Sequence, residues 1–215
     1  ALDVPSRAAL LPDLQTQLAA AGATAVLVTH DLHEALALGS RMGLLVEGRL
    51  VQEGSAAAVM ARPASDAAAR LLGVENLLPG RVLGSDGGGW RVSLDGSGSA
   101  LRAASAAFAP VPGDRVLLAL RAGAIRLLTT EPPPGWNGLP GHVREARLAA
   151  GGHRVAVDAG RILEVVLPWE SGAHLPSAGT TVVVAFPPEA AHLLPARPPR
   201  PEVPAPPAGR RWTRR

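Results

Sequence analysis

The sequence predicts an α/β segment over residues 1–72 and an all-β segment made from two copies of one module over residues 73–195. Apolar stretches with helical and strand-like spacing alternate up to about residue 72. Beyond it, Gly, Pro and Ser become frequent and the apolar runs shorten, which is typical of short strands joined by turns. This second part also repeats itself, which indicates a duplicated unit.

The first residues predict a helix followed by a buried strand. Leucines at positions 10, 11, 14 and 18 have helical spacing after Pro5, and Gly22 is expected to end the helix. The apolar run Ala25–Val28, bounded by Thr24 and Thr29, is typical of a strand that is covered on both faces of a parallel sheet.

A second helix is expected directly after this run. Asp31 and Glu34 have the spacing of a capping box, in which each side chain satisfies a backbone N–H at the start of a helix. His30 would then lie where a strand ends and a helix begins, the edge at which α/β sheets bind ligands. An imidazole there could donate a hydrogen bond to a terminal phosphate. The alternative is an incidental histidine beside a capped helix.

The remainder of the first segment predicts a hairpin and two short helices. Glu47-Gly48 is a hairpin signal between strands over 43–46 and 49–52. Short helices are expected over 56–60 and 65–72, separated by Pro63.

The second segment repeats itself at two places. Residues 76–82 match residues 137–143 at an offset of 61, and the second block of identities has an offset of 66. In that block Gly113, Val116, Ala119, Ala124, Leu127 and Leu128 match Gly179, Val182, Ala185, Ala190, Leu193 and Leu194. The two repeats are expected over about 76–128 and 137–194. The Pro- and Arg-rich residues 196–215 are predicted to be disordered.

Charge and composition exclude several classes of function. All 21 basic residues are arginine, so the chain lacks the lysine of a Gly-rich phosphate loop. Six arginines lie in residues 197–215, which leaves 15 arginines against 17 acids, or −2, before them. With 3% aromatic residues as well, nucleic-acid binding is not expected. The chain has no cysteine and no histidine spacing that suggests a metal site.

An ordered series of motifs resembles the final third of ABC-transporter ATPase domains, a branch of the P-loop NTPases. It comprises Ala1-Leu2-Asp3, Val28-Thr29-His30-Asp31 with Glu34-Ala35, Gly48-Arg49-Leu50 and Gln52-Glu53-Gly54. The resemblance covers residues 1 to about 72. It implies that Ala1, Leu2 and Asp3 form the D-loop at the partner's nucleotide site and that His30 is the switch histidine at the γ-phosphate, supported by Asp31 and Glu34. Asp3 could instead cap the first helix.

The same resemblance implies what such an enzyme needs besides these motifs. The phosphate loop (Walker A), the signature sequence and the Walker B carboxylates for Mg²⁺ and catalysis do not occur in the chain. Phosphoryl transfer requires these groups together. We therefore expect a fragment of an enzyme that uses ATP and Mg²⁺ when intact, and no catalysis by the chain alone.

The doubled β module resembles the regulatory domain of importer ATPases, the TOBE or molybdate-binding type with paired OB-like barrels. The stretch Phe186–Leu194 carries this likeness. Its oxyanion element is missing, and Glu75 beside Asn76 would repel an anion. Oxyanion binding is therefore left open.

These resemblances imply a cytoplasmic ATP-binding subunit of an ABC importer, peripheral at the inner face of the cell membrane. Its partners would be a second ATPase subunit and permease membrane subunits, with an oxyanion as a possible ligand and no nucleic acid. Molybdate or tungstate is the first candidate solute, followed by sulfate, iron, polyamine or sugar. The alternative function is a stand-alone oxyanion-binding or storage protein.

Overall fold

The computed structural model describes residues 4–149, 151–169 and 175–196, with side chains from residue 10 onward. The predicted D-loop, Ala1 to Asp3, and almost all of the predicted disordered tail lie outside the described residues. The first helix, α1, spans Val4–Ala20, as its leucine spacing predicted. Gly22 ends it in the left-handed conformation, with the Ala23 N–H donating to the Leu18 carbonyl and the Gly22 N–H to the Ala19 carbonyl. This pair of bonds is the Schellman arrangement.

The prediction of a strand at Ala25–Val28 is wrong. Residues 23–29 have no regular secondary structure, and Val26 and Val28 are 90% and 83% exposed. An isolated apolar run cannot form a strand, because its backbone N–H and C=O groups need a neighbouring strand. Among the described residues, no strand pairs with this one. His30 therefore follows an irregular segment, and the parallel sheet expected for residues 1–72 is absent from the part described.

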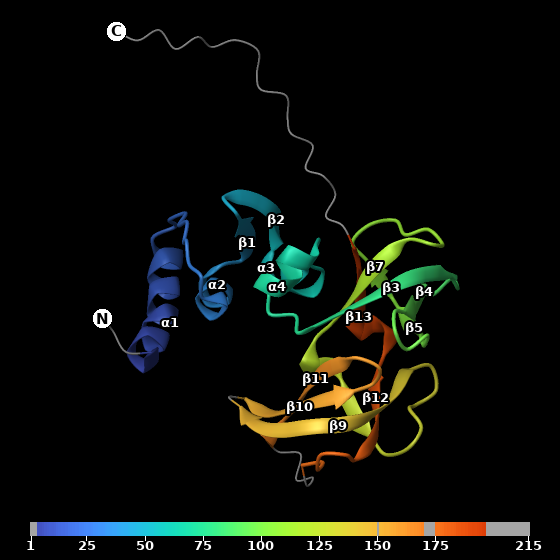
Figure 1. The fold of residues 1–215 in the computed structure, drawn as a ribbon. Coiled ribbons are helices and arrows are strands. Elements are labelled where there is room, and N and C mark those ends of the chain that lie inside the picture. Colours follow the sequence, from blue (N-terminus) through green and yellow to red (C-terminus); the bar gives the residue numbers. More distant parts are fainter. Residues whose placement is uncertain (1–3, 150, 170–174, 197–215) are drawn as a thin grey trace.

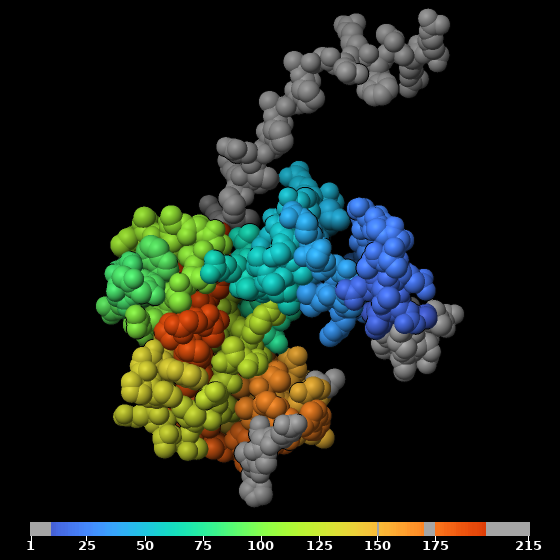
Figure 2. Space-filling view, turned by 180° about the vertical axis from the view of Figure 1, so that it is seen from behind, coloured from blue at the N-terminus to red at the C-terminus, as the bar shows by residue number. Residues whose placement is uncertain are grey.

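The rest of the first segment is a small α+β unit. Strands β1 (Arg41–Val46) and β2 (Arg49–Ser55) form the predicted hairpin, with Glu47 and Gly48 both at positive φ, as a two-residue turn requires. Helices α3 (Ala56–Ala61) and α4 (Asp66–Leu71) begin at serine caps and pack on this hairpin. Their shared core consists of Met42, Leu44, Val59, Ala68 and Leu72. Figures 1 and 2 show this unit between α1 and the β-rich body.

Two sheets make up the β-rich body, and their strands pair antiparallel except for β13 and β6, which pair in parallel. One has the strand order β5-β4-β3-β7-β13-β6 and the other β11-β10-β9-β12-β8. The strands of the first half are β3 (Asn76–Ser85), β4 (Trp90–Leu94), β5 (Ala100–Ala103), β6 (Ser105–Ala106), β7 (Arg115–Leu120) and β8 (Arg126–Leu128). Those of the second half are β9 (Asn137–Ala149), β10 (Gly152–Asp158), β11 (Ile162–Leu167), β12 (Thr181–Phe186) and β13 (Ala191–Pro195). Short 3₁₀ turns, η1 (Ala122–Ala124) and η3 (Pro188–Ala190), precede β8 and β13.

The two halves have the same register and exchange their last strands. β3 pairs with β7 at Asn76↔Leu120, and β9 pairs with β12 at Asn137↔Phe186, positions related by the offsets of 61 and 66. β8 then pairs with β12 in the second sheet, whereas β13 pairs with β7 in the first. Each repeat therefore supplies the strand that extends the other repeat's sheet.

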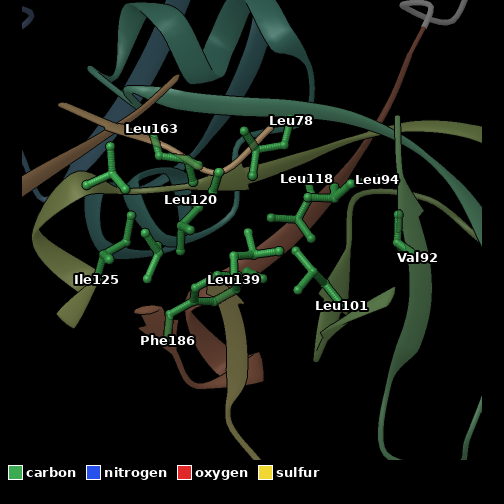
Figure 3. Packing of buried hydrophobic residues seen from close by; sticks show 14 of the residues in the cluster. Leu78, Val92, Leu94, Leu101, Leu118, Leu120, Ile125, Leu139, Leu163 and Phe186 are labelled. Carbon is green, nitrogen blue, oxygen red and sulfur yellow. The ribbon is translucent and has the colours of Figure 1, made fainter. Parts of the chain in front are cut away.

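One hydrophobic core joins both sheets. Leu78, Leu118 and Leu120 from the first half lie against Leu139 and Phe186 from the second (Figure 3). Gly80 and its repeat equivalent Gly141 allow neighbouring strands to approach, since a Cβ at either would lie 2.6 Å from a carbonyl oxygen. None of the helices in the described residues combines the length and hydrophobicity that a membrane crossing requires.

Candidate functional site

Of the predicted site residues, His30, Asp31 and Glu34 lie together at the start of α2 (Leu32–Leu38), whereas Ala1, Leu2 and Asp3 lie outside the described residues. Asp31 is the N-cap, and its Oδ1 accepts from the backbone N–H groups of His33 (2.8 Å) and Glu34 (3.4 Å). This half of the capping box is confirmed. Capped in this way, the short helix has a fixed starting point although none of its residues is buried.

The other half of the capping box, a hydrogen bond from the Asp31 N–H to the Glu34 side chain, was predicted wrongly. The Asp31 N–H donates to Thr29 Oγ1 at 3.0 Å rather than to the Glu34 carboxylate. The Thr29 hydroxyl in turn donates to Glu34 Oε2 at 2.7 Å. Thr29 therefore stands between the two partners, because its hydroxyl accepts and donates at once. The sequence signal for this arrangement was Thr29 itself, two residues before the cap.

His30 lies at the outer side of this turn. Its side chain is exposed, and within the described residues it makes no hydrogen bond or ion pair. The flanking bonds of Thr29 and Asp31 fix the backbone on either side of it. The imidazole is thus free to bind a group from outside, but no described side chain orients it.

The described residues do not form a complete site for ATP or Mg²⁺. No cluster of three or more His, Asp or Glu side chains that could hold a metal ion occurs in the part of the chain that is described. The Asp31 carboxylate is occupied by two backbone donors. A triphosphate needs several convergent backbone and cationic donors. His30 alone could contact one phosphate oxygen.

The two buried asparagines of the repeats bind backbone groups. Asn137 is 6% exposed; its Oδ1 accepts from the Arg102 N–H at 2.7 Å and its Nδ2 donates to the Arg102 carbonyl at 2.9 Å. Asn76, 3% exposed, makes the same pair of bonds to Glu164 at 2.8 and 2.9 Å. Each asparagine thus holds the edge strand of the other repeat. Their match at an offset of 61 indicated equivalence but not these partners.

Glu75 has a structural role that sequence reasoning missed. Its Oε2 accepts from the Ala122 N–H at 3.0 Å, at the beginning of η1. The neighbouring Arg121 reaches across to the first segment, where Nη2 donates to the Met60 carbonyl and Nη1 to the Leu72 carbonyl, both at 3.0 Å. These are carbonyls at the ends of α3 and α4, which otherwise lack helical partners. Arg121 therefore joins the β-rich body to the first segment, and Glu75 holds the turn that follows Arg121.

His192 makes a second connection between the two parts. It is 5% exposed, with Nε2 3.0 Å from the Pro63 carbonyl and Nδ1 2.8 Å from Ser105 Oγ. Since a carbonyl only accepts, Nε2 carries the hydrogen, and Nδ1 accepts from the serine hydroxyl. Burial lowers the pKa of His192; the bond to Pro63 opposes this shift, and the charge of Arg62 adds to it. A neutral, satisfied imidazole of this kind is structural.

A shallow hollow on the second repeat offers no clear anion site. It has a volume of about 370 Å³ and is lined by His142, Arg144, Asp158 and Gly179, among others. The Arg144 guanidinium is paired with the Asp158 carboxylate, whose pKa it holds below the ordinary value. The cation is therefore already neutralised.

Comparisons with known proteins give one consistent group of relatives. Molybdate/tungstate import ATP-binding protein WtpC of Thermococcus kodakarensis is 39% identical over 101 residues, which are 45% of this chain and 31% of that protein. WtpC of Pyrococcus horikoshii is 42% identical over 79 residues, or 37% and 23%. Spermidine/putrescine import ATP-binding protein PotA 1 of Pseudomonas aeruginosa is 31% identical over 171 residues, or 78% and 45%.

The longest of these matches includes both parts of the chain. A stretch of 171 residues within 215 must contain residues on either side of residue 73. The chain nevertheless spans less than half the length of these relatives. No family model matches. Among solved structures, the cytoplasmic molybdate-binding protein ModG has a TM-score of 0.48 and 18% identity, covering 56% of this chain and 96% of that one.

Proposed function

We propose that this chain, whose relatives are ATP-binding subunits of ABC importers, is the C-terminal part of such a subunit. Closing of two nucleotide sites around ATP would drive the membrane permease between its two orientations. The subunit would act at the inner face of the membrane, paired with a second ATPase subunit. The β-rich body would be its regulatory domain. The similarity across both parts of the chain is the observation that carries this proposal.

The exposed run before His30 supports the same function. Val26 and Val28 have the sequence of a buried strand and yet lie in solvent. Burying a valine stabilises a protein by about 1.5–3 kcal/mol, so leaving both exposed forgoes a substantial free energy. In the intact subunit we expect residues 25–28 to pair with other strands of the ATPase domain. His30 would then come to the edge of a sheet, as the motif series implies.

His30 would donate a hydrogen bond to the γ-phosphate, and Ala1 to Asp3 would reach the site of the second subunit. Asp31, Thr29 and Glu34 would hold the backbone on which His30 is placed. ATP and Mg²⁺, when bound, supply the phosphoryl group and the charge that neutralises it. Their other contacts would come from segments that carry the phosphate loop and the signature sequence.

The solute of the importer is proposed from the relatives. Two of the three relatives described above are named for molybdate and tungstate, and we propose this class of solute. The described residues give less support to oxyanion binding by the β-rich body itself, because the Asn76 and Asn137 amides are already bonded. Titration calorimetry with molybdate, tungstate and sulfate tests this point. Binding with a dissociation constant in the micromolar range would favour the oxyanion-storage alternative.

The function is tested by comparing two histidines three residues apart. In a full-length subunit containing this segment, His30→Ala should reduce ATP turnover and solute uptake by ~100-fold or more. This is the typical loss of rate when a side chain that donates or accepts a proton in the transition state is removed. ATP binding should persist. His33→Ala is the matched control, since His33 is an exposed histidine in the first turn of α2 and its loss should leave turnover unchanged.

Two results would contradict the proposal. One is ATP turnover by the 215-residue chain alone that disappears in His30→Ala, because it would require a complete site within these residues. The other is a genomic reading frame that starts at Ala1 with no phosphate loop or signature sequence before it, which would favour the stand-alone alternative.

A further inference from the structure

The outer face of the first sheet carries arginines on four adjacent strands, β5, β4, β3 and β7. In the strand register Arg91 lies directly opposite Arg102, and Arg81 directly opposite Arg115. Arg81 also lies opposite Ser93, two residues from Arg91, which places both pairs on one face. All four side chains are exposed. We call Arg81, Arg91, Arg102 and Arg115 the arginine row.

Most of this positive charge is not neutralised. The Arg102 Nε lies 2.9 Å from the Asp86 carboxylate, but the Arg81 Nη1 donates to the Gly113 carbonyl, which carries no net charge. Arg91 and Arg115 have no ion-pair partner within the described residues. Like charges directly opposite each other destabilise a sheet. The row therefore costs folding stability.

The second repeat shows that the fold does not require arginine at these positions. The register gives the equivalents directly: His142 opposite Thr181 corresponds to Arg81 opposite Arg115, and Ala156 opposite Glu164 corresponds to Arg91 opposite Arg102. None of the four equivalents is an arginine. The two sheets therefore differ in charge at these four positions. The second sheet also has opposed arginines, Arg147 and Arg154, but each lies within 4.0 Å of a glutamate carboxylate.

A second group of arginines occurs in the sequence after residue 196, which lies beside the row. The Ala196 N–H donates to the Arg115 carbonyl at 3.3 Å, so the described chain ends beside the row. The sequence continues from there with six arginines and one acid, Glu202. A second basic segment of the sequence therefore begins directly after a residue that is bonded to the row.

We propose that the arginine row is a docking surface for anionic phospholipid headgroups. Polybasic surfaces bind anionic membranes with about 1 kcal/mol for each arginine near the surface. Single-stranded nucleic acid, the other extended polyanion, is held mainly by aromatic stacking. The strands of the row contain one aromatic residue, Trp90, which is half-buried and packs against the core. An anionic headgroup layer needs only the guanidinium groups.

Vesicle co-sedimentation of the 215-residue chain tests this inference. The chain should bind vesicles that contain phosphatidylglycerol and should not bind pure phosphatidylcholine vesicles. The variant with Arg81→Gln, Arg91→Gln and Arg115→Gln should bind on the order of 100-fold more weakly, since each arginine contributes about fivefold. Wild-type binding should weaken as salt rises, because exposed charges are screened.

A matched variant separates the row from net charge. Arg49→Gln, Arg147→Gln and Arg161→Gln remove the same charge from exposed positions elsewhere and leave the tail intact. An equal loss of binding in this control would overturn the proposal, as would absence of binding to anionic vesicles. Row-dependent binding of an oligonucleotide without binding to vesicles would also overturn it.

Stability is measured on the same samples. The triple variant should melt at or above the wild-type temperature, since it removes opposed like charges. If it fails to fold, Arg91→Gln alone should still weaken binding about fivefold. Because no step involves nucleotide, the outcome is independent of the ATPase proposal.

Discussion

Replacing Asn137 tests the reciprocal contact between the two repeats. Asn137→Ala removes both hydrogen bonds to the Arg102 backbone. Each such bond contributes about 1 kcal/mol, and the freed Arg102 groups lie on an edge strand that water can partly reach. We therefore expect the free energy of unfolding to fall by about 2–3 kcal/mol.

Asn137→Asp is the sharper variant because it retains the shape of the side chain. It retains the acceptor for the Arg102 N–H but directs a second carboxylate oxygen at the Arg102 carbonyl, where Nδ2 donates in the wild type. Placing this charge at a position that is 6% exposed should cost more than the alanine variant does at neutral pH. The cost should shrink in acid, where a protonated carboxyl group can donate again.

Urea unfolding followed by tryptophan fluorescence measures these differences, provided that the denaturant slope is unchanged. Asn76→Ala should give a similar loss, since its two bonds to Glu164 repeat the geometry. Thr130→Ala, at an exposed position, is the control and should stay within about 0.5 kcal/mol. A change of that small size for Asn137→Ala, or an aspartate variant as stable as the wild type, would refute the reasoning.

Two further predictions concern packing and pH. Gly141→Ala would place a Cβ 2.6 Å from the Asp158 carbonyl oxygen and should destabilise by about 1–3 kcal/mol, whereas Gly123→Ala has open space and should be close to neutral; thermal melts compare them. Burial lowers the pKa of His192 below its usual 6.5, so the folded state disfavours the protonated ring. The contribution of His192 to the free energy of unfolding should therefore be fully present above about pH 6.5 and be lost as the pH falls below that value. In His192→Gln this part of the pH dependence should be missing. The same pH dependence of the free energy of unfolding in both proteins would contradict the role of His192.

Local signals in the sequence predicted the parts of the fold that depend on neighbours along the chain. Glu47-Gly48 predicted the hairpin and Gly22 the helix end, because glycine adopts positive φ without steric cost. Asp31 predicted a helix start because its carboxylate can accept hydrogen bonds from the first backbone N–H groups of a helix. The hydrogen-bond donor to Glu34 was predicted wrongly. Whether the Thr29 hydroxyl or the Asp31 N–H donates to its carboxylate depends on side-chain geometry within the turn.

Features that depend on distant segments were not accessible from the sequence. Ala25–Val28 has a strand composition, but strand formation depends on a partner that the described residues do not provide. The offset of 61 identified Asn76 and Asn137 as equivalent positions, whereas their partners, Glu164 and Arg102, lie 88 and 35 residues away. The division into domains stays a prediction, and the roles of His30, Asp31 and Glu34 stay proposals. For Ala1, Leu2 and Asp3 the described residues give no geometry.

The exchange of β8 and β13 has a consequence for how a signal could pass through the β-rich body. β8 belongs to the first repeat but pairs with β12 of the second, and β13 belongs to the second repeat but pairs with β7 of the first. A ligand or partner that displaces either repeat must shift a strand in both sheets, so the halves are expected to respond jointly and not one at a time. Since β13 also holds Pro63 through His192, such a response would be transmitted to the segment that carries α3 and α4.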